Sequence, residues 1–209
     1  MQALAGGESH DEVFTVTVTD DQGGTDSQVV TVNVTGTNDN PTITGIDNST
    51  YTENAGAQVI DSDLIVGDVD DANLESAKVE IANYVSGQDV LTASTGGTGI
   101  LVSFNTTTGV LELVGNASVS NYEAVLRTVA YENASENPDT TPRQIKFTVF
   151  DGKAVSASTS ASITVIAEND GPTVTSPSLT IEEGETVALT ALALGVEDVD
   201  DAPARGRGP

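Results

Sequence analysis

Short stretches in which apolar and polar residues alternate run through most of the chain. Alternation with a period of two is typical of half-buried β-strands, because successive side chains on a strand point to opposite faces. Glycine, proline, asparagine and aspartate, the residues that favour turns, separate these stretches. The pattern predicts strands over residues 76–84, 99–104, 109–115 and 143–150, and within the long segment 155–166.

The last two of these segments are joined by Asp151, Gly152 and Lys153, a short turn-forming connection. We therefore expect them to be neighbouring antiparallel strands. Within them, Phe147 is expected to point into the core, and so is Phe14 in a similar stretch near the N-terminus.

One segment, residues 118–129, departs from the alternation. Ser120 and Glu123 have the spacing of a capping box, in which each side chain satisfies a backbone N–H of the other at the start of a helix. Apolar residues follow at the helical spacing i, i+3, i+4 and i+7: Tyr122, Val125, Leu126 and Val129. The sequence predicts one short helix in an otherwise all-β chain, and many short strands of this kind favour a Greek-key β-sandwich.

The chain also repeats itself. Asp20 aligns with Asp151 at an offset of 131, the difference between the two numbers, and TNDNPTIT aligns with ENDGPTVT at the same offset. The acidic segment 68–71 aligns with 198–201 at an offset of 130. An ordered series of matches indicates tandem repeats. We expect residues 41–171 to form one complete repeat, 1–40 to be the last strands of a preceding one, and 172–209 to begin a following one.

Charge narrows the functional classes. The chain has 32 acidic and 7 basic residues, a formal net charge of -25, and no cysteine. Nucleic acid is an unsuitable partner, because phosphate binding requires clustered lysine and arginine. Bound cations would relieve the repulsion among so many carboxylates. No apolar run is long enough for a membrane span, so none is expected in this sequence.

The acidic loops are the candidate site. Asp68, Asp70 and Asp71 have a D-x-D-D spacing that lets alternate carboxylates turn toward one hard cation, which prefers six to eight oxygen ligands. Asn38, Asp39 and Asn40 add further oxygens next to Pro41. A solvated turn would use the same residue types, but the recurrence of both segments at the repeat offset favours calcium.

These motifs carry a resemblance. The linkers NDNP and ENDGP, the DVDD loops and TENAGAQV resemble the motifs of cadherin repeats, and LIVGDVDDANLESAKVEI, NYEAVLRTVAYEN and RQIKFTVFDG are similar to cadherin-like and VCBS-like tandem repeats of large bacterial adhesins of the RTX type. The resemblance covers nearly the whole chain. It implies a cadherin-like or immunoglobulin-like sandwich, an extracellular or cell-surface location, and calcium bound between successive repeats.

Ligands follow from the resemblance by matching position. The first junction would use Asn38, Asp39, Asn40, Asp68 and Asp70, and the second would use Glu53, Asn169, Asp170, Asp198 and Asp200. Asp20 and Asp151, which begin equivalent hairpins, would be weaker additions. The chain departs from the cadherin pattern because Asn40 directly precedes Pro41, Gly171 replaces an asparagine, and the L-D-R-E motif is absent. The oxygen count then predicts roughly one or two ions per junction.

Two function classes remain open. The leading one is a calcium-stiffened repeat that acts as a spacer and cell-adhesion module, with homophilic contacts between repeats as one variant. The alternative is a carbohydrate-binding module accessory to a secreted enzyme, which would require exposed aromatic side chains. No catalytic constellation stands out, so the chain itself is not expected to be an enzyme.

Overall fold

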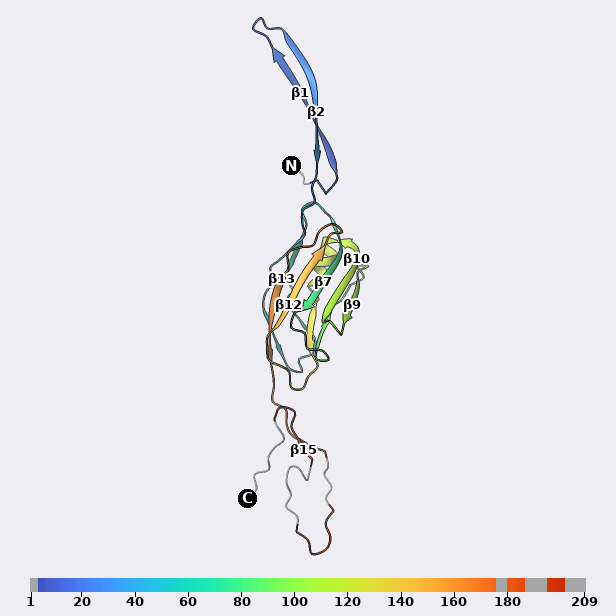
Figure 1. Ribbon diagram of the computed structural model, residues 1–209, viewed down its shortest axis with the longest axis vertical. Coiled ribbons are helices and arrows are strands. Elements are labelled where there is room, and N and C mark those ends of the chain that lie inside the picture. Colours follow the sequence, from blue (N-terminus) through green and yellow to red (C-terminus); the bar gives the residue numbers. More distant parts are fainter. Residues whose placement is uncertain (1–3, 176–179, 187–194, 202–209) are drawn as a thin grey trace.

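A computed structural model describes residues 4–175, 180–186 and 195–201. These residues form an elongated molecule with a β-sandwich in the middle (Figure 1). A hairpin of β1 (Ser9–Thr19) and β2 (Thr25–Thr35) extends from one end, and the short pair β14 (Thr173–Val174) and β15 (Val196–Glu197) lies beyond the other end. None of the helices in the described part is long and apolar enough to cross a membrane.

The sandwich consists of a six-stranded sheet, a three-stranded sheet and a two-stranded pair. The six-stranded sheet has the order β4 (Ser49–Thr52), β13 (Thr159–Ile166), β12 (Arg143–Phe150), β7 (Asn73–Ile81), β10 (Val110–Ser118), β9 (Leu101–Asn105). The three-stranded sheet has the order β5 (Gln58–Val59), β11 (Ala130–Asn133), β8 (Asp89–Thr92), and β3 (Thr42–Thr44) pairs with β6 (Ile65–Gly67). Neighbours such as β12 and β7 are far apart in the sequence, as Greek-key connections require. The predicted all-β sandwich with one short helix is confirmed.

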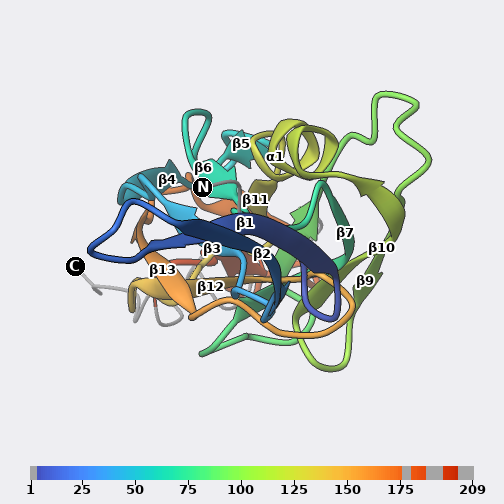
Figure 2. The ribbon, with the colours of Figure 1, turned by 90° about the horizontal axis from the view of Figure 1, so that it is seen from above.

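The sandwich encloses a single cluster of buried apolar side chains. Alternate residues of β12 and β13, such as Phe147 and Ile163, are at most 1% exposed and face this core. The helix α1 (Val119–Leu126) packs against β6, β7 and β10, and the view along the molecule shows it at one side of the sandwich (Figure 2). Its buried residues Tyr122, Val125 and Leu126 close the core on that side, as their helical spacing predicts.

The predicted strands correspond closely to the observed ones. The segment 143–150 coincides with β12, whose burial alternates along its length. As expected, β12 and β13 are antiparallel neighbours. The segment 155–166 is only partly a strand: β13 begins at Thr159, and Val155 makes an isolated bridge to Phe150. The strand predicted at 76–84 is shifted, because β7 begins at Asn73 and ends at Ile81.

The helix begins two residues earlier than the capping-box spacing suggests. Ser118 is the N-cap, and its Oγ accepts a hydrogen bond of 3.2 Å from the Asn121 backbone N–H. Glu123 instead pairs with Arg127 at 3.0 Å and accepts a hydrogen bond from the Val66 backbone N–H at 3.0 Å. The prediction that Ser120 caps the helix is therefore wrong, because a contact with β6 takes the glutamate that a capping box would use.

This correction can be tested with two neighbouring serines. Replacing Ser118 by alanine should lower the free energy of unfolding by about 1 kcal/mol, the usual cost of losing an N-cap hydrogen bond. Ser120→Ala is the matched control: Ser120 is exposed and its hydroxyl lies 2.9 Å from the Ser118 hydroxyl, but it caps no backbone N–H in the described residues. It should change the free energy of unfolding by less than about 0.5 kcal/mol. Urea unfolding followed by circular dichroism measures both, and a larger effect at Ser120 would restore the capping-box prediction.

The β1–β2 hairpin repeats the register of β12 and β13. Phe14 pairs with Val30, and their counterparts at the offset of 131, Ile145 and Ala161, pair in the same way. The face that is buried in β12 and β13 is exposed in the hairpin, however, and Phe14 is 52% exposed. The prediction that Phe14 points into the core is wrong, since neither β7 nor β4 has a counterpart beside the hairpin in the described chain.

A buried ion pair that the sequence pattern did not predict lies within the core. Arg143 and Asp89 are joined by a hydrogen bond of 2.8 Å from Nε to Oδ2, and both side chains are fully buried. The other carboxylate oxygen of Asp89 accepts from the Tyr131 hydroxyl at 2.6 Å and from Asn133 Nδ2 at 2.8 Å. This network fixes the end of β11, from which the loop to β12 departs.

Candidate cation sites

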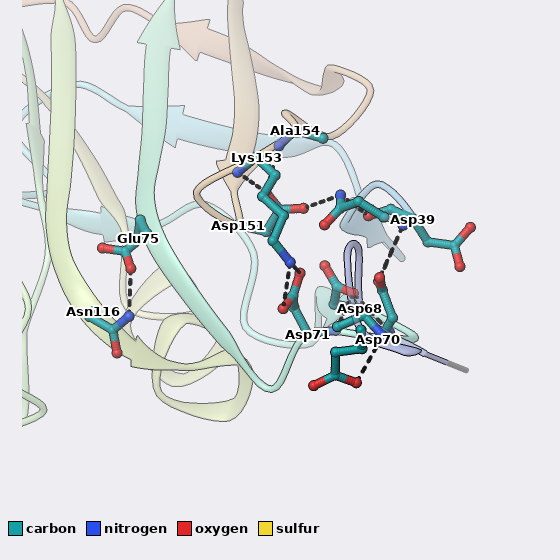
Figure 3. Close-up of polar contacts among 12 residues, drawn as sticks. Asp39, Asp68, Asp70, Asp71, Glu75, Asn116, Asp151, Lys153 and Ala154 are labelled. Atoms are coloured by element: carbon teal, nitrogen blue, oxygen red, sulfur yellow. Dashed lines mark hydrogen bonds and ion pairs between the residues drawn. The ribbon is translucent and has the colours of Figure 1, made fainter. Parts of the chain in front are cut away.

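The first candidate site lies at the end of the sandwich that faces the hairpin. We define the first cluster as Asn38, Asp68, Asp70, Asp71 and Asp151 (Figure 3). Asp68 organises its own loop, because its Oδ1 accepts hydrogen bonds from the backbone N–H groups of Asp70 at 3.1 Å and Asp71 at 3.0 Å. Oxygens of Asp68, Asp70 and Asp71 thereby lie within 4.8 Å of one another.

The linker contributes to this cluster unequally. Asn38 donates from Nδ2 to Asp151 Oδ2 at 2.9 Å and to its neighbour's carbonyl at 2.7 Å, so that Oδ1 remains available. Asp39 contacts Asp70 through its backbone N–H, at 3.2 Å to Oδ2, while its carboxylate is exposed and points away from the cluster (Figure 3). Asn40 is exposed, and the described residues give its side chain no hydrogen bond.

Asp151 joins the cluster from the β12–β13 turn. Its Oδ1 accepts two backbone hydrogen bonds of 2.6 Å, from Lys153 and Ala154. Burial alone would raise the pKa of Asp151, but the hydrogen bonds from Asn38, Ala154 and Lys153 outweigh it and hold the pKa below its usual value. Its Oδ2 is therefore a charged acceptor directed at the linker.

The second candidate site, beyond the other end of the sandwich, repeats this arrangement. Asn169 Nδ2 donates to the Asp170 carbonyl at 2.7 Å, and the Asp170 backbone N–H donates to Asp200 Oδ2 at 2.5 Å. Asp198 Oδ1 accepts from the backbone N–H groups of Asp200 at 3.1 Å and Asp201 at 3.3 Å. Each hydrogen bond has a counterpart in the first cluster, so the two acidic loops share one local geometry.

Two glutamates complete this second site. Glu53, directly after β4, is only 4% exposed, and its Oε2 accepts a hydrogen bond of 2.8 Å from the Glu168 backbone N–H. Glu136, in the loop after β11, brings a carboxylate oxygen within 4.8 Å of oxygens of Glu53 and Asp170. We define Glu53, Glu136, Asp170, Asp198 and Asp200 as the second cluster. An open pocket beside it is lined by residues 170–171, 173 and 197–199 together with Glu136.

Asn54 positions Glu136 in this cluster. Its backbone φ is 60°. Residues other than glycine rarely adopt a positive φ, but asparagine tolerates it comparatively well. The side chain then donates from Nδ2 to Glu136 Oε2 at 2.9 Å. Local backbone strain of this kind commonly occurs at functional sites, and here it directs a loop carboxylate toward the buried Glu53.

Unpaired oxygens show that both clusters suit a cation. Buried polar atoms almost always make hydrogen bonds, yet four buried oxygens of the clusters and their linkers make none with the described residues: Asn38 Oδ1, Glu53 Oε1, Asp68 Oδ2 and Asp170 Oδ2. All four are carboxylate or amide oxygens, the ligands that calcium prefers. A bound cation would give these oxygens a partner and offset the cost of burying them.

The pKa values of two aspartates also favour a bound cation. Burial raises the pKa of Asp68, and the neighbouring Asp70 carboxylate adds to the effect. Partial burial likewise raises the pKa of Asp170, together with the negative charges of Asp200, Glu136 and Asp198. In both clusters the negative charge is therefore incompletely compensated by the protein itself.

Sequence reasoning missed Glu136 because its signal is weak. The counterpart of Glu136 at the repeat offset is Ala5, so the comparison that identified the acidic loops passes over it. It also lies in SENPDTT, where an acidic residue is unremarkable for a polar loop. Only the approach of β4 and the β11–β12 loop in three dimensions places it beside Glu53 and Asp170.

The chain has only limited similarity to known proteins. No protein family model matches the chain. Halomucin of Haloquadratum walsbyi is 33% identical over 122 residues, which is 56% of this chain and 1% of that protein. Among solved structures, the human desmocollin-1 ectodomain has a TM-score of 0.37 and 13% identity, over 92% of this chain and 34% of that one. Function therefore has to be argued from the residues themselves.

Proposed function

We propose that this chain is a calcium-stiffened structural repeat of an extracellular adhesin, which serves as a spacer and a cell-adhesion module. The observation that carries the proposal is the recurrence of one hydrogen-bonded acidic geometry at both ends of the sandwich. Each time, buried oxygens have no hydrogen-bond partner in the part of the chain that the structure describes. A solvated turn would recur without leaving such oxygens buried.

In this proposal the hairpin β1–β2 ends one repeat, residues 41–171 form the next, and β14–β15 begin a third. The identical register of the two hairpins supports the division. The strand pairings at the start of the two units also support it, because Thr42 pairs with Gly67 in the same way as Thr173 pairs with Glu197. The region of Halomucin that is similar to this chain is only 1% of that protein. This similarity supports the proposal that the chain is one part of a much longer protein.

Calcium would act on the junctions mechanically. Carboxylates on either side of a short linker repel each other, so without a cation the neighbouring units bend apart. A shared ion replaces this repulsion with coordination and restricts the angle between units. At the second cluster, Glu53 and Glu136 come from the sandwich, Asp170 from the linker, and Asp198 and Asp200 from the segment that follows, so one ion would tie all three together.

Isothermal titration calorimetry with calcium tests the proposal. The full chain should bind calcium with a dissociation constant between about 1 μM and 1 mM, the range from sensor sites to extracellular modules. Asp68→Asn and Asp198→Asn should each remove binding at one cluster. Asp20→Asn is the matched control, because Asp20 makes the same kind of turn, accepting from Gln22 and Gly24, at the far tip of the hairpin. Absence of binding to the unaltered chain would refute the proposal.

The carbohydrate-binding alternative receives less support from the described residues. Tyr51, Tyr122 and Tyr131 are at most 1% exposed, and Phe147 is fully buried. These side chains form the core and its hydrogen-bond network, so they are not available as a platform for stacking on sugar rings. Phe14 is 52% exposed, but it is the only phenylalanine, tyrosine or tryptophan of β1 and β2, so the hairpin does not offer a platform of several rings.

A further inference from the structure

Lysine is scarce in this chain, yet one lysine lies inside the first cluster. The Nζ of Lys153, in the β12–β13 turn, donates to both carboxylate oxygens of Asp71, at 3.0 Å and 3.3 Å (Figure 3). The Asp71 side chain is only 22% exposed, so its carboxylate is partly shielded from water, whereas Lys153 is 42% exposed and reaches it from the surface. The ammonium group thus occupies the side of Asp71 that a cation would otherwise contact.

The repeat shows that a lysine is not needed to form this turn. At the offset of 131, Lys153 corresponds to Gln22 of the hairpin. The turn is nevertheless the same, because Asp20 and Asp151 each accept backbone hydrogen bonds from the residue two positions later, Gln22 at 3.0 Å and Lys153 at 2.6 Å. The lysine side chain is therefore an addition to a turn that forms without it, and its contacts lie with the acidic loop.

Lys153 acts on more than Asp71. Its backbone N–H donates to Asp151 Oδ1 at 2.6 Å while its Nζ donates to Asp71. The lysine thus contacts two carboxylates of the first cluster.

We propose that Lys153 is a resident counter-ion of the first cluster, which takes the place of a metal ion at Asp71 and weakens calcium binding there. The inference rests on the proposed function, since it concerns the affinity of the same site. It predicts that the first junction keeps part of its order at low calcium, because the lysine already neutralises part of the charge there.

Calcium titration of the 15N-labelled full chain by NMR tests this, because the amide signals of residues 38–40 and 169–170 report the two clusters separately. Lys153→Gln should lower the apparent dissociation constant at the first cluster by roughly three- to tenfold, the scale of one unit charge acting on a divalent ion near a protein surface. The constant at the second cluster should not change. Lys146→Gln is the charge-matched control, since Lys146 lies in the middle of β12 and pairs across the sheet with Glu80 of β7.

Two further measurements separate this role from a structural one. In chelator, Lys153→Gln should melt at a lower temperature than the unaltered chain, and with saturating calcium the difference should disappear or reverse. The double variant Asp71→Asn, Lys153→Gln should lose the gain in affinity. If the unaltered chain binds calcium and Lys153→Gln binds it no more tightly at the first cluster, the inference fails while the proposed function stands. If neither cluster of any variant binds calcium, the proposed function fails.

Discussion

Replacing Arg143 by methionine should lower the free energy of unfolding by about 3–5 kcal/mol, because it leaves a buried carboxylate without its charged partner. Arg143 is fully buried and donates from Nε to Asp89 at 2.8 Å and from Nη1 to the Thr141 carbonyl at 2.6 Å. Asp89 keeps its neutral donors, Tyr131 and Asn133, which cannot balance its charge. Urea unfolding of the full chain in chelator, followed by circular dichroism, gives the difference.

The exposed pair Lys78 and Glu80 provides the control. Lys78 Nζ and Glu80 Oε2 are 2.7 Å apart, which is about as short as the Arg143–Asp89 contact. The side chains of Lys78 and Glu80 are, however, 48% and 36% exposed. Lys78→Met should therefore cost less than about 1 kcal/mol, as surface ion pairs generally do. The double variant Asp89→Asn, Arg143→Met should recover part of the loss by removing the stranded charge. An Arg143→Met variant within 1 kcal/mol of the unaltered chain would show that water reaches Asp89.

The alternating strands could be predicted because their signal is local. In β12 the apolar residues fall on every second position, and a strand has no other way to bury them together. The spacing of Tyr122, Val125 and Leu126 is equally local and specifies the buried face of α1. The turn of Asp151 could be inferred because the repeat supplies the same turn twice.

The errors come from contacts between distant segments. Phe14 has the pattern of a core residue, but whether it is buried depends on strands that would have to pack on the hairpin. Glu123 has the spacing of a capping box, but the Val66 backbone N–H competes for it. The Asp89–Arg143 pair joins residues far apart in the sequence whose identities alone suggest two exposed charges. Likewise, Glu136 becomes a candidate ligand only where its loop meets Glu53.

Calcium should stabilise the folded chain by about 2.7 kcal/mol for each occupied cluster when the free ion is at 100 times its dissociation constant. Glu53→Gln should remove most of this gain at the second cluster, because it replaces a buried carboxylate by a neutral amide. The comparison of urea unfolding with saturating calcium and with chelator measures the gain. Glu112→Gln, an exposed position on β10 that pairs across the sheet with Lys78, is the control and should leave it unchanged.

The sign of the effect without calcium distinguishes a binding residue from a structural one. In chelator, the unpartnered Oε1 of Glu53 is a buried charged oxygen with an energetic cost. Glutamine keeps an oxygen to accept from the Glu168 backbone N–H and offers an amide donor to Glu136 or Asp170. Glu53→Gln should therefore be at least as stable as the unaltered chain in chelator and less stable in calcium. A variant that is equally destabilised in both conditions would mean that Glu53 serves only to hold the linker, and calcium binding at the second cluster would have to rest on its other carboxylates.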